Sequence, residues 1–261
     1  MVKKISSIKV HSLASGSKGN CLLIETNGAN VLVDMGISYR KLCSRLTELN
    51  MSLADISAVF ITHEHKDHVS GLTTFMKSCD INVFAREQTW RNIQDWRNLR
   101  KNFCQKLTDS IVLDCLQVEP FSIPHDAADP VGFNFYYDRL KCSVLTDVGF
   151  PSSSVREKIH NADYLVLEAN HDLDMLQHSH YPDYLKQRIR SNKGHLSNAD
   201  AGWLLSHSID SKNMKVMLAH LSAENNTGTK ALQSVQDVLK QTSKIHKADI
   251  RVALQDQIIS M

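Results

Sequence analysis

One stretch constrains this chain more than any other: residues 58–71, which read AVFITHEHKDHVSG. Residues 58–62 form a short apolar and β-branched run that predicts a buried strand. Burying many ionisable groups without an ion would cost several kcal/mol, and imidazole and carboxylate ligands suit zinc, manganese or iron(II). We therefore expect a metal centre where this strand ends, at the four potential ligands His63, His65, Asp67 and His68.

The spacing of these ligands favours two ions over one. His63 and His65 are two residues apart, so their rings can converge on one ion in an extended turn. Asp67 and His68 lie beyond the bend and are free to face a second ion. A single loop histidine is usually plain polar surface, so the prediction depends on all four ligands occurring together.

The string HEHKDH matches the HxHxDH signature, and with it the chain resembles the metallo-β-lactamase superfamily in residue types, spacing and the strand-then-helix setting. The resemblance implies an α/β fold of the α+β kind, a four-layer αββα sandwich. The chain has 261 residues and 42% hydrophobic content, which is enough for a sizeable core. We expect one domain over residues 1–261 rather than two small ones.

Overall charge and cysteine usage say little about partners but bear on location. Thirty basic against 28 acidic residues leave a net charge of +2, too small to indicate nucleic acid or an anionic membrane. No run approaches the roughly 18 to 20 apolar residues of a membrane-spanning helix, so we expect no membrane association. The six cysteines are widely spread without a CxxC pair, and no signal peptide precedes them. We predict reduced thiols in a soluble, cytoplasmic protein.

The chain opens with a predicted strand at residues 5–13, a small polar loop at 14–20 and a second strand at 21–25. Gly, Ser and Asn are common turn residues, so a plain hairpin turn explains the loop. Oxyanion contact is the alternative, although the loop lacks the GxxxxGK[ST] spacing of a nucleotide P-loop. The candidate substrate contacts are Ser15, Ser17, Lys18 and Asn20.

A third predicted strand, residues 31–33, ends at Asp34 and is followed by a helical pattern at residues 39–49. In the superfamily, an aspartate at this place supports the metal-binding loop and does not itself bind metal. The resemblance gives Asp34 that supporting role. A helix-capping aspartate is the alternative.

Three more candidate ligands follow predicted strands. His125 comes after the strand at residues 116–122, and Asp147 ends a hairpin formed by residues 131–137 and 140–146. His220 ends a strand at residues 215–219. At superfamily-like intervals from HEHKDH, the resemblance groups them as His63, His65 and His125 on one metal, Asp67, His68 and His220 on the other, and Asp147 bridging the two.

Glu168, in the string EAN, and His195, in GHLSN, narrow the family. With AHLS they resemble the nucleic-acid-processing branches, which include tRNA 3′-processing nucleases and β-CASP nucleases. The bacterial YycJ/WalJ-type group is the most similar, and the similarity extends from residue 10 to residue 255. Too few residues separate Glu168 and His195 for a β-CASP insert, and no long arm of the tRNA-processing kind is present. The strings that carry the similarity are LASGSKGNC, TDVG, EANHD, YPDYLKQRI, GHLSNADA and AHLSAENN.

The resemblance implies a metal-dependent phosphodiesterase acting on nucleic acid, most specifically a DNA exonuclease of 5′ to 3′ direction. Two divalent ions, zinc or manganese with iron also suited, would hold a hydroxide formed at neutral pH. Asp67 would orient this nucleophile, and His195, oriented by Glu168, would protonate the departing sugar oxygen. DNA is favoured over RNA on the resemblance alone, and the oligomeric state stays open, a dimer included.

Two basic segments are candidates for phosphate binding. One is a run with no acidic residue, comprising Lys186, Arg188, Arg190 and Lys193. The other, residues 86–106, is rich in arginine and lysine and carries Trp90, Trp96 and Phe103. The first is either a solvated helix edge or a contact for neighbouring phosphates. The second is either a solvated helix, with the aromatic side chains packed inward, or a groove that holds a nucleic-acid backbone and stacks its bases.

Other functions remain open. The same metals serve glyoxalase-II-like thioester hydrolases and hydrolases of small cyclic phosphodiesters, while a non-catalytic metal-binding or nucleic-acid-binding regulator could keep the fold. The pair Glu168 and His195 discriminates between a phosphodiesterase and a thioester hydrolase, because a thiolate leaving group needs no proton. A further patch we expect in a loop at the rim of the site contains His171, Asp172, Asp174, His178 and His180.

Overall fold

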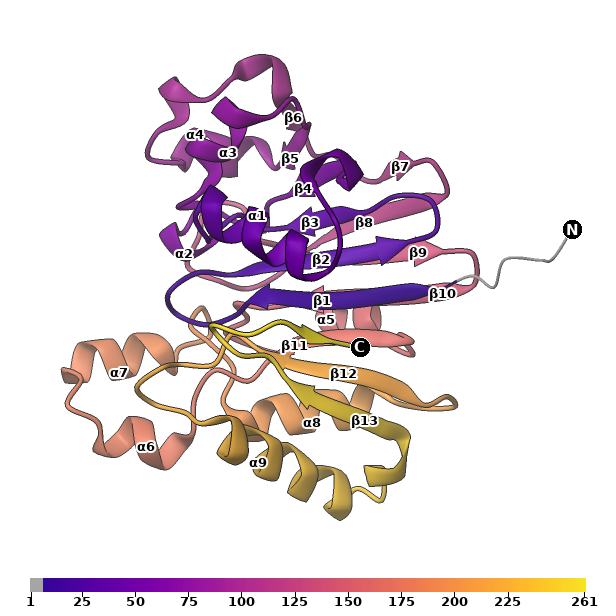
Figure 1. Cartoon of the computed structure of the whole chain (residues 1–261). Coiled ribbons are helices and arrows are strands. Elements are labelled where there is room, and N and C mark those ends of the chain that lie inside the picture. Colours follow the sequence, from indigo (N-terminus) through magenta and orange to yellow (C-terminus); the bar gives the residue numbers. More distant parts are fainter. Residues whose placement is uncertain (1–6) are drawn as a thin grey trace, which may run out of the picture.

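Two seven-stranded β-sheets form the centre of the computed structural model, which describes residues 7–261 (Figure 1). The first sheet has the order β14 (Ile259–Ser260), β1 (Ile8–Ala14), β2 (Cys21–Thr26), β3 (Val31–Val33), β4 (Ala58–Phe60), β5 (Val83–Ala85) and β6 (Cys104–Lys106). The second has the order β13 (Ala248–Val252), β12 (Met214–Ala219), β11 (Tyr164–Glu168), β10 (Leu140–Leu145), β9 (Val131–Tyr137), β8 (Leu116–Ser122) and β7 (Ile111–Leu113). Of the first predicted strand, residues 5 and 6 lie outside the described residues.

Each sheet is half antiparallel and half parallel. β1, β2 and β3 pair antiparallel, whereas β3, β4, β5 and β6 run parallel. In the second sheet β7 to β10 pair antiparallel, and β10 to β13 run parallel. Side chains that follow parallel neighbours collect at one edge of a sheet, where their carboxyl ends meet.

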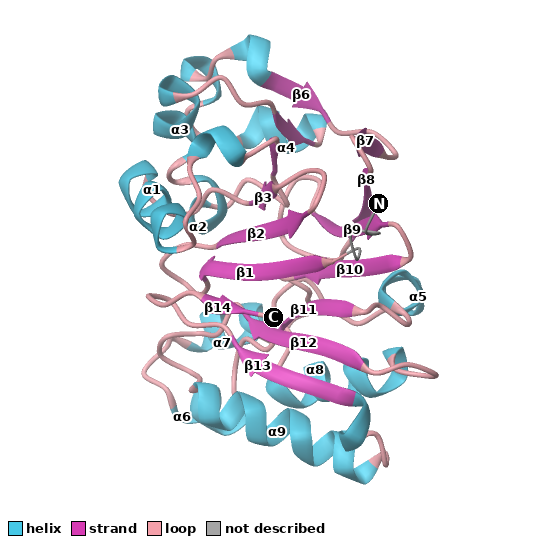
Figure 2. Ribbon diagram, turned by 45° about the vertical axis from the view of Figure 1, so that its right-hand side comes forward, coloured by secondary structure: helices cyan, strands magenta, loops and turns pink. Residues whose placement is uncertain are grey.

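Helices cover the outer face of each sheet (Figures 1 and 2). The first sheet carries α1 (Tyr39–Glu48), α2 (Lys66–Val69), α3 (Leu72–Ser78) and α4 (Glu87–Asn92). The second carries α5 (Ser153–Ile159), α8 (Asn198–Ser208) and α9 (Gly228–Gln241), while α6 (Leu173–His178) and α7 (Asp183–Ile189) project to one side. Short 3₁₀ turns lie at Leu53–Asp55, Trp96–Asn98, Lys101–Phe103 and Ile245–Lys247.

The two sheets share one apolar core. Phe60 of the first sheet packs edge-on against Phe133 and Phe135 of the second, with ring centroids 5.7 and 6.2 Å apart. Burying such side chains stabilises the folded chain by about 1.5–3 kcal/mol each. Separate clusters lie between the first sheet and α1, α3 and α4, and between the second sheet and α5, α8 and α9. The αββα layering predicted from the sequence is confirmed.

Two short helices follow the strand that precedes the metal ligands. α2 starts at Lys66 and α3 starts at Leu72. Gly71 lies between them, and a Cβ there would meet the carbonyl oxygen of Ile37 at 1.8 Å. The ligands Asp67 and His68 therefore lie inside a short helix and not in the preceding loop.

The basic segment at residues 86–106 does not form an aromatic groove. Trp90 is buried, and Trp96 packs against it with 5.5 Å between ring centroids. The ammonium group of Lys101 covers the face of Trp96, and the guanidinium of Arg100 lies over Phe103. These contacts favour the alternative in which the aromatic side chains pack inward.

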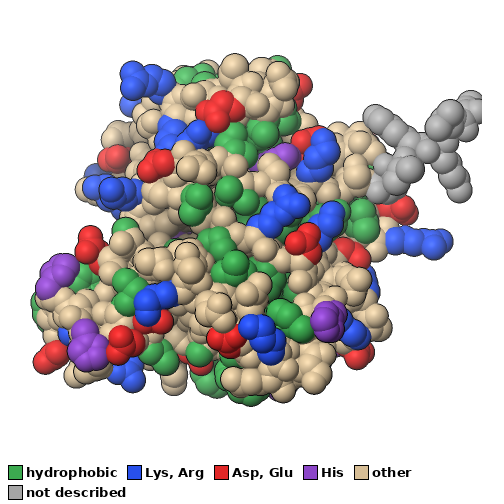
Figure 3. Space-filling view, turned by 60° about the horizontal axis from the view of Figure 1, so that its bottom comes forward, with side chains coloured by type: hydrophobic (Ala, Val, Ile, Leu, Met, Phe, Trp, Pro, Cys, Tyr) green, Lys and Arg blue, Asp and Glu red, His purple; other side chains and the backbone are tan. Residues whose placement is uncertain are grey.

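Charged side chains of both signs are interspersed on the face that carries α6, α8 and α9 (Figure 3). This mixture agrees with the small net charge of +2. None of the helices in residues 7–261 is long and apolar enough to cross a bilayer.

Candidate metal centre and active site

The predicted metal ligands converge at one end of the sandwich, where strands of both sheets finish. The HEHKDH residues follow β4 of the first sheet. His125, Asp147 and His220 follow β8, β10 and β12 of the second sheet. The structure therefore brings together side chains up to 157 positions apart in the sequence, from His63 to His220.

Within the described residues, the ligand atoms form groups whose members lie within 4.8 Å of one another. One group is His63, His65 and His125, and a second is Asp67, His68 and His220. Asp147 joins His63 and His68 in a third group. The same aspartate also groups with Glu168, His195 and His220, so it is shared between clusters.

Two buried ligand atoms in this cluster have no hydrogen-bond partner within residues 7–261. They are Nε2 of His63 and Oδ2 of Asp147. Buried polar atoms are almost always paired, and lone pairs of imidazole and carboxylate suit zinc and manganese. The donor set therefore fits divalent cations.

Three residues of the site have left-handed backbone conformations that are uncommon for side chains with a Cβ. Asp34 has φ 64°, Asp147 φ 60° and His220 φ 56°. Asp34 and His220 lie directly after β3 and β12, and Asp147 lies two residues after the end of β10. Such conformations cost about 1–3 kcal/mol each and gather at functional sites.

Hydrogen bonds at Nδ1 orient three of the imidazole rings. His68 donates to Asp34 at 2.7 Å, His125 to the carbonyl of Gly194 at 3.1 Å, and His220 to Glu168 at 3.0 Å. In each ring, Nε2 is left to face the ligand cluster. This pattern is typical of metal-binding histidines, whose partners fix the tautomer and the orientation of the ring.

Asp34 is hydrogen-bonded to the segment that carries the metal ligands. Its carboxylate accepts hydrogen bonds from the backbone N–H and the hydroxyl of Thr62, at 2.8 and 3.0 Å, in addition to the bond from His68. Asp34 is buried, with 3% of its surface exposed. None of the ligand groups in the described residues includes Asp34, which agrees with a supporting position.

Glu168 is fully buried and serves two histidines at once. Its Oε1 accepts from His195 at 2.8 Å and from His220 at 3.0 Å. Its Oε2 accepts the backbone N–H groups of Val148 and Leu196 at 2.9 and 3.0 Å. Burial opposes its charge, but the two histidines outweigh burial and hold the pKa of Glu168 well below its usual range.

His195 lies at the edge of the ligand cluster. Burial disfavours its charged form, but the nearby carboxylates, Glu168 foremost, outweigh burial and raise the pKa of His195. One fifth of its side chain remains exposed. Its ring lies 5.2 Å from that of His125 and 5.3 Å from that of His220.

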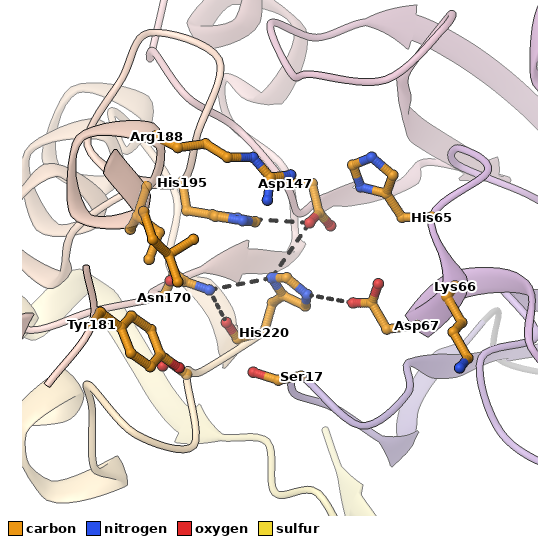
Figure 4. A pocket seen from close by; sticks show the side chains of 13 residues that line it. Ser17, His65, Lys66, Asp67, Asp147, Asn170, Tyr181, Arg188, His195 and His220 are labelled. Carbon is orange, nitrogen blue, oxygen red and sulfur yellow. Dashed lines mark hydrogen bonds and ion pairs between the residues drawn. The ribbon is translucent and has the colours of Figure 1, made fainter. Parts of the chain in front are cut away.

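A cleft of about 380 Å³ opens over these residues (Figure 4). Asp67, Asp147, His195 and His220 point into it, with Arg188 and Tyr181 on one side and His65 and Lys66 on the other. The volume lies within the range of small-molecule sites, about 300–1,000 Å³. The ligand cluster is thus accessible from solvent.

Comparison with known proteins places this chain in a family. A model described as the beta-lactamase superfamily domain matches residues 29–207. Over 257 residues the chain is 32% identical to exodeoxyribonuclease YycJ of Bacillus anthracis, which covers 95% of this chain and 97% of YycJ. The chain belongs to the metallo-β-lactamase superfamily.

Within this superfamily the chain falls in the YycJ/WalJ group. It is 34% identical over 249 residues to exodeoxyribonuclease WalJ of Streptococcus pneumoniae, covering 94% of this chain and 93% of WalJ. The metallo-β-lactamase fold protein YhfI of Bacillus subtilis has a similar structure, with TM-score 0.73 at 14% identity and coverage of 97% and 99%. The family resemblance predicted from the sequence is confirmed.

Only some of the residues that the sequence predicted as substrate contacts line the cleft. Ser17 and Arg188 line the cleft. Ser15 instead accepts the backbone N–H of His220 at 2.7 Å. Asn20 donates to Asp67 at 3.1 Å and to His68 at 3.2 Å. Ser15 and Asn20 therefore hold the ligands, and both are buried.

The other basic side chains that the sequence predicted as phosphate contacts lie away from the cleft. Lys186 and Arg190 line a separate cavity and bond to Gln177. Lys18 and Lys193 are exposed, and neither lines the cleft. Helical geometry explains the difference, because Arg188 is two positions from Lys186 and from Arg190 and so projects from another face of α7.

Sequence reasoning missed the apolar face that α7 and the residues before it turn toward the cleft. Tyr181, Leu185 and Ile189 recur every four residues and all line the cleft. This spacing is the sequence signal that would have identified them. Asp126 was also not predicted from the sequence. Its Oδ2 lies 2.6 Å from Nε of Arg188, and its Oδ1 lies 3.4 Å from Nε2 of His125.

The histidine-rich patch does not form a second metal site within the described residues. His171 is buried, and burial lowers its pKa to about 4. Asp172 caps α6, and His178 pairs with Asp174 on the exposed side of that helix. These residues build the start of the α6–α7 projection.

Proposed function

We propose that this protein is a metal-dependent phosphodiesterase that degrades DNA as an exonuclease, in the 5′ to 3′ direction. The observation that carries the proposal is the hydrogen-bonded Glu168–His195 pair beside a complete set of metal ligands. The choice of DNA is supported by the names of YycJ and WalJ, both exodeoxyribonucleases matched over nearly their whole length. The 5′ to 3′ direction is an expectation from the family resemblance.

Seven side chains would hold two divalent cations, zinc or manganese. One set is His63, His65 and His125, and the other is Asp67, His68 and His220, with Asp147 shared between them. When bound, such cations lower the pKa of a coordinated water and neutralise charge on a phosphate group. All other steps belong to the residues of the chain.

His195 would act as the general acid. Its Nδ1 donates to Glu168, which fixes the ring and leaves Nε2 to face the cleft. From there it would donate a proton to the sugar oxygen that leaves when the phosphodiester breaks. A sugar alkoxide is a poor leaving group, so this proton is needed for a phosphodiester but not for a thioester.

Arg188 would bind the phosphate group in the cleft. Its Nε is held by Asp126, so the guanidinium is fixed with its two terminal nitrogens directed into the cleft (Figure 4). A planar guanidinium suits phosphate oxygens, which it contacts in pairs. Ser17 adds a hydroxyl to the lining of the cleft.

A cytoplasmic location forms part of the proposal. All six cysteines lie within the described residues, and each is a free thiol. Free thiols are typical of reducing compartments.

The proposal is tested by reconstituting the apo protein with zinc or with manganese. Single- and double-stranded DNA and RNA, labelled at the 5′ or the 3′ end, are supplied beside a glutathione thioester. We expect the 5′ label of DNA to be released first and the thioester to stay intact. Intact nucleic acid under both metals, together with a cleaved thioester, would refute the proposal.

A further inference from the structure

A second cavity, also of about 380 Å³, lies beside the metal cleft. One wall is formed by the ligand loop and the helices α2 and α3, and the other by the end of α4 and the loop after it. The mechanism proposed above uses no group from the second wall. The volume is within the range of sites for small organic groups, about 300–1,000 Å³.

The two cavities share a wall. His65 and Lys66 line both of them. In the cleft, these two residues lie across from Arg188, Tyr181 and His195 (Figure 4). The second cavity therefore lies next to the side of the cleft that is away from His195.

The charges around this cavity argue against a phosphate group inside it. Lys66 lies at the shared wall, but Glu64 and Asp95 also line the cavity. Two carboxylates against one ammonium group leave a surplus of negative charge, which repels a phosphate. Lys66 is placed to contact a phosphate at the mouth of the cavity and not one within it.

The uncharged part of the cavity lining contains both apolar and polar side chains. Val69 and Ile93 supply apolar surface, and Asn92 and Gln94 supply side-chain amides. The Nδ2 group of Asn92 donates to the carbonyl of Gln88 at 2.9 Å, which leaves its Oδ1 to accept a hydrogen bond. A nucleobase has this same combination, with flat faces that pack on apolar groups and an edge of donors and acceptors.

We propose that this cavity binds a nucleobase of the substrate. It belongs to the nucleotide that keeps the cleaved phosphate, because the leaving sugar is on the side of His195. The carboxylates of Glu64 and Asp95 accept hydrogen bonds from amino groups of the base, and Lys66 contacts the phosphate at the mouth. This inference rests on the proposed nuclease function and extends it to a site for base recognition.

The test uses single-stranded DNA with one abasic residue on either side of the bond that is cut first. We expect the abasic residue on the phosphate-bearing side to lower kcat/KM of the metal-loaded protein by about tenfold, the loss of one base contact. The double variant Asn92→Ala/Gln94→Ala lowers kcat/KM on intact DNA by a similar factor. It removes most of the penalty on the phosphate-bearing side and leaves the penalty on the other side unchanged.

Asn98→Ala is the matched control, since Asn98 is exposed on the same segment and does not line the cavity. Hydrolysis of bis(p-nitrophenyl) phosphate, which has no base, is expected to be the same in the wild type and both variants. Equal kcat/KM for intact and abasic DNA in the wild type would overturn the base site while leaving the nuclease function in place. If the wild type cuts no nucleic acid, the proposed function fails and this inference fails with it.

Discussion

Glu168 couples the proposed acid to the proposed metal ligands. One of its oxygens accepts from both His195 and His220, and the other accepts two backbone N–H groups. The sequence predicted the first contact, because EAN and GHLSN occur together in the family. It could not predict the contact with His220. Glu168 of β11 pairs with Ala219 of β12, and His220 is the residue after Ala219.

The variant Glu168→Gln tests whether Glu168 supports metal binding through His220 as well as catalysis through His195. The glutamine must point its NH₂ group either at two histidine N–H donors or at two backbone donors, so one pair loses its acceptor. We expect metal affinity to fall about 10–100-fold and activity to fall further. Metal content after dialysis checks the result, with Glu119→Gln, a partly exposed ion-pair residue of β8, as the control. Unchanged metal affinity would contradict the link to His220.

Asp126 and Arg188 give a second prediction at the scale of single residues. Asp126→Asn weakens the contact that fixes the guanidinium, so we expect KM for DNA to rise about tenfold while kcat changes less. Steady-state kinetics on a short oligonucleotide measure both constants. Lys186→Ala, which removes a cation that faces the other cavity, should alter KM less than about twofold. An equal effect of Lys186→Ala would refute the assignment of Arg188 to the cleft.

At the scale of elements, the loops that hold the ligands pack backbone against backbone. Gly36, which follows β3, touches the ligand helix α2 so closely that a Cβ would meet the carbonyl oxygen of Asp67 at 1.7 Å. The sequence predicted the strand, its end at Asp34 and the helix that follows. It gave no sign of this contact, because the approach of two distant backbones leaves no local pattern.

Gly36→Ala should therefore be severely destabilising. No flexible side chain can move away, so the ligand helix must shift, and we expect a loss of more than about 3 kcal/mol in the free energy of unfolding. Urea denaturation measures this loss. Gly228→Ala at the start of α9 is the control, because its nearest atom lies 3.4 Å from the added Cβ, and it should change stability by less than about 1 kcal/mol. Similar stability of the two variants would contradict the packing described here.

For the whole molecule, the four layers were predicted from the family resemblance that the HEHKDH signature carries, whereas periodicity predicted only single strands and helices. The site was predictable where ligands follow strands in the family pattern. It was not predictable where a residue's role depends on which way it faces, as with Lys186 and Arg188 on α7. Ser15 and Asn20 are a similar case, since they bond to ligands instead of facing the cleft.

The metal ligands come from both sheets, so bound metal should hold the sandwich together. A ligand present at 1,000 times its dissociation constant adds about 4 kcal/mol to stability, and 1 kcal/mol shifts Tm by about 2–4 °C in a domain of this size. We expect a chelator to lower Tm by about 8–16 °C, measured by calorimetry and restored by zinc or manganese. An unchanged Tm would contradict a metal centre that joins the two sheets.

The central claim is that His195 supplies the proton to a poor leaving group. The most direct measurement compares His195→Ala with the wild type on DNA and on the p-nitrophenyl ester of thymidine 5′-phosphate, whose leaving group needs no proton. We predict a loss of about 10²–10⁴ in kcat on DNA, a much smaller loss on the ester, and unchanged metal content. An equal loss on both substrates, or the loss of an ion, would show that His195 is not the acid.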